Sequence, residues 1–146
     1  MEELPLVNFH FQIDWGGTRV GFTEVTGLDM EYEVLEYRHG ASLRYSTEKI
    51  PGLRKFSNII LKRGVYKDDN DAFKWFNDFR QSKERRDITI SLLDEEHTPT
   101  VTWLVHNAWL VSIQYSKLHA TRTEVFIERM ELAHEGIKVK NGSESK

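Results

Sequence analysis

Residues 9–15 read Phe9-His10-Phe11-Gln12-Ile13-Asp14-Trp15, and this stretch decides the fold class. Apolar and polar residues alternate strictly, which places the four apolar side chains on one face of a half-buried strand. Gly16-Gly17 follows and can adopt the positive backbone angles of a two-residue hairpin turn. A return strand through Val20, Phe22 and Val25 would complete a β-hairpin. The stretch therefore predicts a β-rich protein that begins with this hairpin.

Similar alternation recurs through most of the remaining chain. It predicts strands at residues 29–37, 58–62, 88–92, 101–105, 108–115 and 123–134. Residues 70–81 instead repeat their apolar side chains at helical spacing, and acidic residues lie at the start of the segment. The expected fold is mainly β, an antiparallel sandwich or barrel-like domain of seven or eight strands with one short α-helix inserted mid-chain.

Two segments lack a pattern typical of core elements. Residues 38–53 show too little periodicity for a core strand, and loops of this length are commonly functional or disordered. Residues 138–146 are polar and predict a flexible C-terminal tail. We therefore expect one domain over residues 1–137 and a tail over residues 138–146.

Composition excludes several classes of protein. The chain has 146 residues, no cysteine and a net charge of −3, so it fits one domain without disulfides or thiolate metal sites. No apolar stretch reaches the roughly 18 residues of a membrane helix, and acids stand near the N-terminus where a secretory signal carries basic residues. Membrane insertion and classical export are not expected. The charge balance also gives no basic footprint for nonspecific nucleic-acid binding.

No motif for catalysis, cofactor binding or metal binding stands out. The six histidines lack the spacing of metal ligands. The acids at 68–71 lack the central glycine and terminal glutamate of a calcium loop, and a helix start explains them. The acids at 94–96 are typical of a solvated turn, and no G-x-S-x-G elbow is present. The sequence therefore predicts no catalytic, cofactor-binding or metal-binding residue and does not favour an enzyme.

Seven segments, in order along the chain, resemble the phage tail tube protein family. They are Gly21-Phe22-Thr23-Glu24-Val25-Thr26-Gly27-Leu28, residues 33–40 (EVLEYRHG), 50–53 (IPGL), 58–64 (NIILKRG), 87–95 (DITISLLDE), Trp103 with Asn107-Ala108-Trp109, and 131–136 (ELAHEG). Two positions depart from the family pattern, because Leu110 stands where proline is frequent and Arg122-Thr123 where Gly-Asn is frequent. Because of these departures, the resemblance does not assign the chain to a particular ring of the tube.

The resemblance implies a structural subunit of the inner tube of a contractile phage tail or an extracellular contractile injection system. Such subunits form six-membered rings that stack around a hollow lumen, and strands of neighbouring subunits join into one barrel. The implied partners are further copies of the chain, a sheath protein, baseplate and spike proteins, and a cargo of effector protein or DNA. The implied location is a particle that is assembled in the bacterial cytoplasm and can be released.

Candidate contact residues follow from this resemblance. Arg38, Tyr45 and Lys49 of the long excursion are expected to reach an adjacent subunit or ring. The polar strand faces are expected to contact neighbours or to line the lumen through four acids, Glu31, Glu33, Glu124 and Glu128. Long exposed strands also need a partner for their edges, which ring closure supplies. A monomeric binding module, a hydrolase and a tube-initiating ring at the baseplate remain alternatives.

Overall fold

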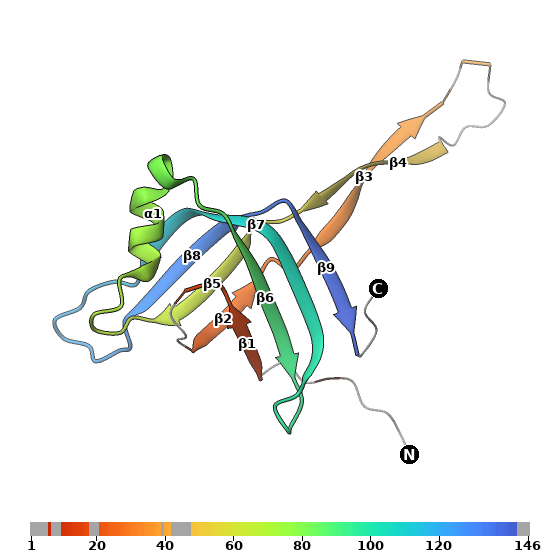
Figure 1. The fold of residues 1–146 in the computed structure, drawn as a ribbon. Coiled ribbons are helices and arrows are strands. Elements are labelled where there is room, and N and C mark those ends of the chain that lie inside the picture. Colours follow the sequence, from red (N-terminus) through yellow and green to blue (C-terminus); the bar gives the residue numbers. More distant parts are fainter. Residues whose placement is uncertain (1–5, 7–9, 18–20, 39, 42–47, 143–146) are drawn as a thin grey trace.

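The computed structural model of the protein describes residues 6, 10–17, 21–38, 40–41 and 48–142, and within them lie nine strands and one helix (Figure 1). The elements in chain order are β1 (Phe11–Asp14), β2 (Phe22–Thr26), β3 (Met30–Tyr37), β4 (Glu48–Phe56), β5 (Ile59–Gly64), α1 (Asp71–Ser82), β6 (Arg86–Leu93), β7 (Pro99–Tyr115), β8 (Ile127–Ala133) and β9 (Gly136–Asn141). The expected fold class, mainly β and antiparallel with one helix mid-chain, is confirmed.

Two antiparallel sheets share the 17-residue strand β7. The first half of β7 pairs with β6 and β9, and β1 pairs with β6; we call this group sheet A. The second half pairs with β8, which continues through β5 to β2; we call this group sheet B. Asn107, with a φ of 49°, and a register shift between Leu110 and Ser112 lie where β7 passes from one sheet to the other. Strands that switch sheets in sandwiches do so at such irregularities.

The hydrophobic core lies between the two sheets. Buried and partly exposed residues alternate along β5 and β8, and Leu61, Met130 and Leu132 are fully buried. Ile90 and Val105 of sheet A belong to the same cluster. Each such buried side chain contributes roughly 1.5–3 kcal/mol relative to an exposed one, so this layer is the main source of stability.

The helix predicted at residues 70–81 is present as α1. Its buried residues are Ala72 and Trp75, and the ring of Phe79 stacks on that of Trp109 with centroids 5.0 Å apart. The helix ends at Ser82, and the following residue, Lys83, is in the left-handed conformation with its backbone N–H donating to the Phe79 carbonyl.

The predicted N-terminal hairpin is wrong. β1 pairs with β6 and β2 pairs with β5, so the two strands stand at opposite ends of the strand order. Alternation shows which face of a strand is buried, and that part is confirmed, but it does not name the neighbouring strand. Val20 of the expected return strand lies outside the described residues.

Three boundaries near the C-terminus also differ from expectation. Residues 101–105 and 108–115 belong to one strand, because β7 bends without ending. β8 begins at Ile127, so residues 123–126 are not in a strand. Residues 138–141 belong to β9, which pairs with β7, so the expected flexible tail is wrong for these residues.

The expected loop over residues 38–53 is wrong for residues 48–53. They belong to β4, which pairs with β3 as a two-stranded ribbon (Figure 1). Most residues of β4 are exposed, and the strand contains Pro51 and Gly52. A strand with no buried face has no reason to alternate apolar and polar residues, so periodicity could not reveal it.

Candidate assembly interface

The ribbon of β3 and β4 extends away from the two sheets (Figure 1). Register pairs place Met30 opposite Phe56 and Tyr32 opposite Arg54, and the register then shifts at Glu33. Lys55 lies opposite Glu31, and its ammonium is 4.0 Å from the Glu33 carboxylate, so the two acids share one face of the ribbon. Leu35 approaches Gly52 from the same side as Glu33, so the acids and the aliphatic residues are not fully separated.

Large apolar side chains on the ribbon are exposed to solvent. Leu53 is 73% exposed and Tyr32 is 61% exposed. The full set is Met30, Tyr32, Val34, Leu35, Tyr37, Ile50 and Leu53. A two-stranded ribbon without a packed face is marginally stable in water, and gathered apolar surface marks an interaction site. The ribbon therefore has the character of an element that is completed by a partner.

The charged candidates on the ribbon are exposed or half-buried. Glu31 lies opposite Lys55, and the Glu33 carboxylate is 4.0 Å from the Lys55 ammonium. Lys49 lies opposite Glu36 in the register. An exposed ion pair of this kind contributes about 0–1 kcal/mol, so these charges do little for the fold itself. They are accessible for contacts with another molecule.

The remaining ribbon candidates are less defined. Arg38 is exposed and follows β3 directly. Tyr45 lies outside the described residues.

Glu124 and Glu128 occupy different environments, although the sequence analysis grouped them. Glu124 is exposed between β7 and β8, with its carboxylate 3.8 Å from the Arg122 guanidinium. Glu128 is 5% exposed, and its carboxylate accepts a hydrogen bond of 3.0 Å from Nε of Arg63. The prediction that Glu128 lies on an exposed polar face is wrong, because its side chain points between the sheets.

Arg63 organises a buried polar cluster at this place. Its NH1 lies 3.2 Å from the Asp69 carboxylate, and its guanidinium lies 4.9 Å from the ring centroid of Trp15. Burial and the neighbouring Glu128 raise the pKa of the Tyr115 hydroxyl. The cluster ties β5, β8 and the segment before α1 together, so its role is to hold the fold.

The outward face of sheet B carries polar residues that the sequence analysis did not single out. Lys62 lies between Glu24 on one side and Arg129 on the other, and Arg129 lies beside Gln114. These side chains line a groove of about 510 Å³ together with Thr23, Tyr115, Ser116 and Ile127. The alternation of Arg129 and Glu131 with the apolar Met130 and Leu132 along β8 is the sequence signal that could have identified this face.

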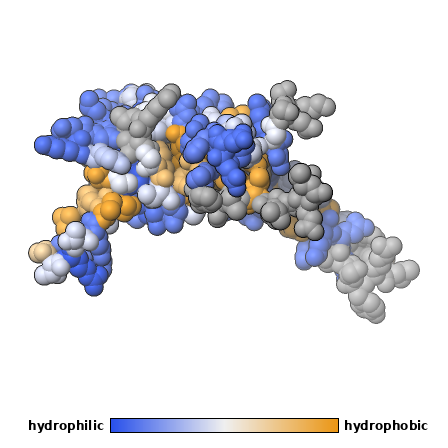
Figure 2. Space-filling model, turned by 90° about the horizontal axis from the view of Figure 1, so that it is seen from below, coloured by the Kyte–Doolittle hydropathy of each residue, from blue (hydrophilic) through white to orange (hydrophobic). Residues whose placement is uncertain are grey.

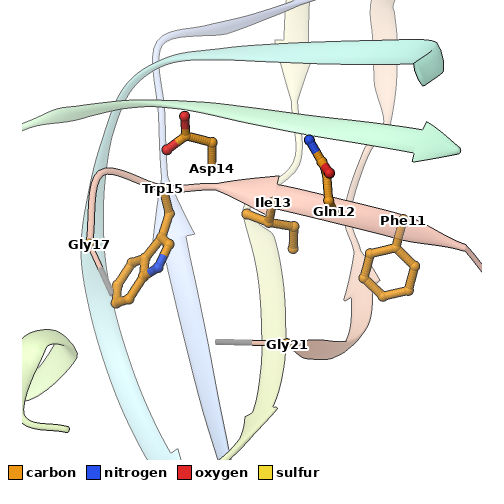
Figure 3. A pocket seen from close by; sticks show the side chains of 7 residues that line it. All are labelled: Phe11, Gln12, Ile13, Asp14, Trp15, Gly17 and Gly21. Carbon is orange, nitrogen blue, oxygen red and sulfur yellow. The ribbon is translucent and has the colours of Figure 1, made fainter. Parts of the chain in front are cut away.

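An opening lies beside β1, one of the two end strands of the strand order, and Gly21, just before β2 at the other end, also lines it. Figure 3 shows Phe11, Ile13 and Trp15 on one side of β1 and Gln12 and Asp14 on the other, as the alternation predicts. A second groove, of about 340 Å³, shares Phe11 with this opening and is lined by Val25, Leu28 and Trp103, among others. Figure 2 shows hydrophobic side chains in the middle of the face seen from below, between hydrophilic flanks.

Polar clusters that could suggest chemistry have structural explanations. The Asp87 carboxylate accepts hydrogen bonds from the Asn107 backbone N–H at 3.0 Å and lies 3.1 Å from Nδ1 of His106. The Asn107 hydrogen bond, together with His106, holds the pKa of Asp87 below its usual range despite some desolvation. Both side chains are exposed, and the contact anchors β6 to the bend in β7.

Within the described parts of the chain, no group of three or more potential ligands could hold a metal ion. His10 and His97 stack with ring centroids 5.1 Å apart, which the sequence did not indicate. In the same residues, no helix has the length and apolar character that crossing a membrane requires.

The chain is similar to proteins of known family and structure. A family model described as "T4-like virus tail tube protein gp19" matches residues 7–138. A chain in the cryo-EM structure of the anti-feeding prophage cap, described as a tube-terminating cap, is 30% identical, with 97% of this chain and 95% of that chain covered and a TM-score of 0.87. No curated protein matches the sequence.

Two further structures belong to an extracellular contractile injection system called PVC. A chain of its extended sheath-tube complex is 30% identical, covering 95% of this chain and 93% of that one, with a TM-score of 0.85. A chain of its extended sheath/tube terminator is also 30% identical, covering 94% of this chain and 98% of that one, with a TM-score of 0.85. Hcp1 from Flavobacterium johnsoniae has a TM-score of 0.57 at 11% identity, which shows a shared fold alone.

Proposed function

Because this chain belongs to the T4-like virus tail tube protein family, we propose that it is a structural subunit of the inner tube of a contractile injection system or phage tail. Copies of the chain assemble into six-membered rings, and the rings stack around a hollow lumen. The family consists of structural tube proteins, so the chain acts through assembly and not through catalysis.

The exposed ribbon is the observation that carries this proposal. Its apolar side chains have no core of their own, and they extend away from both sheets (Figure 1). Contact with another copy would bury them, with a gain of roughly 25 cal/mol for each Å² of apolar surface removed from water. We assign the ribbon, including Glu31, Glu33 and Lys49, to contacts with the adjacent subunit or ring, and we expect Arg38 and Tyr45 of the long excursion to take part in the same contacts.

Sheet B supports closure of a ring through its edges. In the described residues, the outer edge of β2 and the Ser112–Tyr115 edge of β7 have no strand partner. The four strands β7, β8, β5 and β2 alternate in direction, so β2 of one copy would meet β7 of the next as an antiparallel neighbour. Such a head-to-tail contact closes into a ring when its rotation is right, and closure removes the edges.

The proposal extends to partners and location. The sheath surrounds the tube, as the similarity to a chain of a sheath-tube complex supports. Baseplate and spike proteins stand at the end of the tube. Cargo passes through the lumen, and the particle assembles in the bacterial cytoplasm. Glu124, in the exposed segment between β7 and β8, is a further candidate for contact with a neighbouring copy.

Negative-stain microscopy of ribbon variants tests the proposal. We expect purified protein to form rings or tubes, and Tyr32→Asp with Leu53→Asp to abolish them while leaving the fold intact. Glu95→Asp with Glu96→Asp, in the exposed β6–β7 turn, is the control and should assemble normally. Strictly monomeric wild-type protein at high concentration, or unimpaired assembly of the ribbon variant, would contradict the proposal. Isolated rings without tubes would favour a specialised ring at the end of the tube.

A further inference from the structure

The ribbon joins the rest of the molecule through two short connectors (Figure 1). The first connector, residues 27–29, leads from β2 into β3, and the second, residues 57–58, leads from β4 into β5. The two lie against each other, because Gly27 leaves no room for a Cβ beside the Asn58 carbonyl oxygen. Neither connector belongs to a strand pair among the described residues, so the ladders of sheet B do not fix the direction of the ribbon.

Side chains from β8 and from the turn after it hold the second connector instead. Nε2 of the half-buried His134 lies 2.8 Å from the Ser57 carbonyl oxygen. Nδ2 of Asn58 donates to the Glu131 carboxylate at 3.0 Å. The His134 ring also meets the ring of Phe56, the last residue of β4, edge-on with centroids 5.7 Å apart. These contacts attach the base of the ribbon to the body of the subunit.

The two ring nitrogens of His134 have opposite roles. The Gly136 backbone N–H donates to Nδ1 at 3.1 Å, so Nδ1 carries no proton. A carbonyl oxygen only accepts, so Nε2 carries the proton and donates it to Ser57. The contacts therefore require the neutral imidazole. In the imidazolium both nitrogens are donors, and Nδ1 would then face the N–H of Gly136.

The carboxylates near His134 are bonded to other groups. Glu131 accepts from the second connector, and Glu135 accepts from Nδ2 of Asn107 at 2.7 Å. Neither is a hydrogen-bond partner of the imidazole in the part of the chain that the structure describes. The other charged or titratable groups around the base of the ribbon are Asp29, Arg54, Arg85, Asp87, His106 and Lys138. A second proton on His134 would thus break one hydrogen bond without an acceptor in place to form another.

We propose that His134 is a pH-sensitive latch that sets the direction of the ribbon. This inference rests on the proposed function, because the direction matters when the ribbon must reach another copy. Histidine is the side chain that ordinarily changes its charge between about pH 8 and about pH 5. Protonation opens the contact with Gly136 and loosens the second connector, so the ribbon no longer points one way. Binding must then fix that direction again, which weakens assembly in acid.

NMR of the unassembled subunit tests the latch without any tube. Tyr32→Asp with Leu53→Asp supplies the unassembled full chain. At about pH 8 the ring nitrogen shifts of His134 should show the proton on Nε2, and a proton on Nδ1 would overturn the arrangement. On acidification to about pH 5.5, protection of the Gly136 amide against hydrogen exchange should fall roughly two- to tenfold after correction for intrinsic exchange, as expected for one lost hydrogen bond.

His134→Asn is the matched variant. Its side-chain oxygen can accept from the amide two residues further on at every pH, as asparagine does in turns, but it lacks the Nε2 donor to Ser57. Protection of its Gly136 amide should therefore not depend on pH. His119→Asn, in the exposed segment between β7 and β8, removes a different histidine and should keep the wild-type response. An absent response in the wild type, or an equal one in His134→Asn, would overturn the switch.

Distances within the same subunit report the direction of the ribbon. The chain has no cysteine, so spin labels can be attached at Lys49→Cys in β4 and Glu95→Cys in the β6–β7 turn, both exposed positions. The distribution of label distances should become roughly twice as wide between about pH 8 and about pH 5.5, and it should be wide at both pH values in His134→Asn. A constant width while the Gly136 amide opens would overturn the role in direction. If His134→Asn does not fold, the wild-type ring shifts and widths still decide.

Assembly is the last readout. Wild-type tubes counted in micrographs should become fewer on transfer from about pH 8 to about pH 5.5, and His134→Asn should form few at either pH. Tubes that persist in acid while the latch is open would overturn its effect on assembly. If the latch readouts hold but wild-type protein forms no tubes at either pH, the proposed function fails and the latch stands.

Discussion

Replacing Glu128 with alanine tests the account of the buried polar cluster. The Glu128 carboxylate lies 3.0 Å from Nε of Arg63, and the two residues are 5% and 2% exposed. Removing one partner of a buried ion pair costs about 3–5 kcal/mol, because the other charge stays buried without full compensation. Asp69 remains 3.2 Å from the same guanidinium. We therefore expect a loss near the lower end, about 3 kcal/mol of unfolding free energy.

Urea unfolding of the unassembled subunit, followed by tryptophan fluorescence, measures this loss. Glu124→Ala is the matched control, since it removes an acid of the same type four positions earlier in the chain. Its side chain is exposed, so its unfolding free energy should change by no more than about 0.5 kcal/mol. A Glu128→Ala loss below about 1 kcal/mol, or equal to that of Glu124→Ala, would refute the assignment of Glu128 to a buried pair.

Three further changes test other parts of the fold. Gly27→Ala should destabilise the subunit by at least about 1–3 kcal/mol in urea unfolding, because φ is +91° and a Cβ would clash with the Asn58 carbonyl oxygen; wild-type stability would contradict that close approach. Phe79→Ala should lower the unfolding free energy by roughly 2–3 kcal/mol, because the ring stacks on Trp109 of β7. Phe73→Ala, at an exposed site of the same helix, should change it by about 0.5 kcal/mol or less, and equal effects would show that the buried helix face is misassigned. Because the pKa of Asp87 is lowered in the folded protein, its ionised carboxylate stabilises the fold above its ordinary pKa, and this stabilisation is lost as the pH falls through the lowered pKa. The Tm of Asp87→Asn should therefore drop less than the Tm of the wild type between about pH 6 and about pH 3, and equal drops would contradict this.

Local patterns predicted which elements exist and which faces are buried. The helix over 70–81 and the strands β3, β5 and β6 follow from periodicity, because each has a side that meets the core or, for β3, a regular alternation. Periodicity could not give the pairing of β1 with β6 or the continuity of β7, since both depend on partners far away in the sequence. β4 was missed because most of it is exposed and lacks a strong apolar pattern. β9 was missed although Ile137 and Val139 alternate with lysines, because this short pattern lies in a segment whose polar composition is typical of a tail.

For the candidate contact residues, too, local patterns indicate which face a side chain lies on but not which distant residue it contacts. Alternation placed Glu31 and Glu33 on one face of β3, and both lie beside Lys55 in the structure. Glu128 was assigned outward because it alternates with the apolar Ile127 in the sequence, whereas in the structure it shares the buried face of β8. Arg63, on a strand distant in sequence, supplies its buried partner. Pairing of the outward charges Lys62 and Glu24 likewise depends on the register between two strands, which the sequence alone does not fix.

A cryo-EM map of the assembled protein at a resolution that traces individual strands tests the central claim most directly. We predict stacked six-membered rings in which β2 of one subunit pairs antiparallel with the end of β7 of the next, and in which the ribbon contacts another copy. Strictly monomeric particles, or rings whose subunits meet through neither sheet B nor the ribbon, would contradict the account.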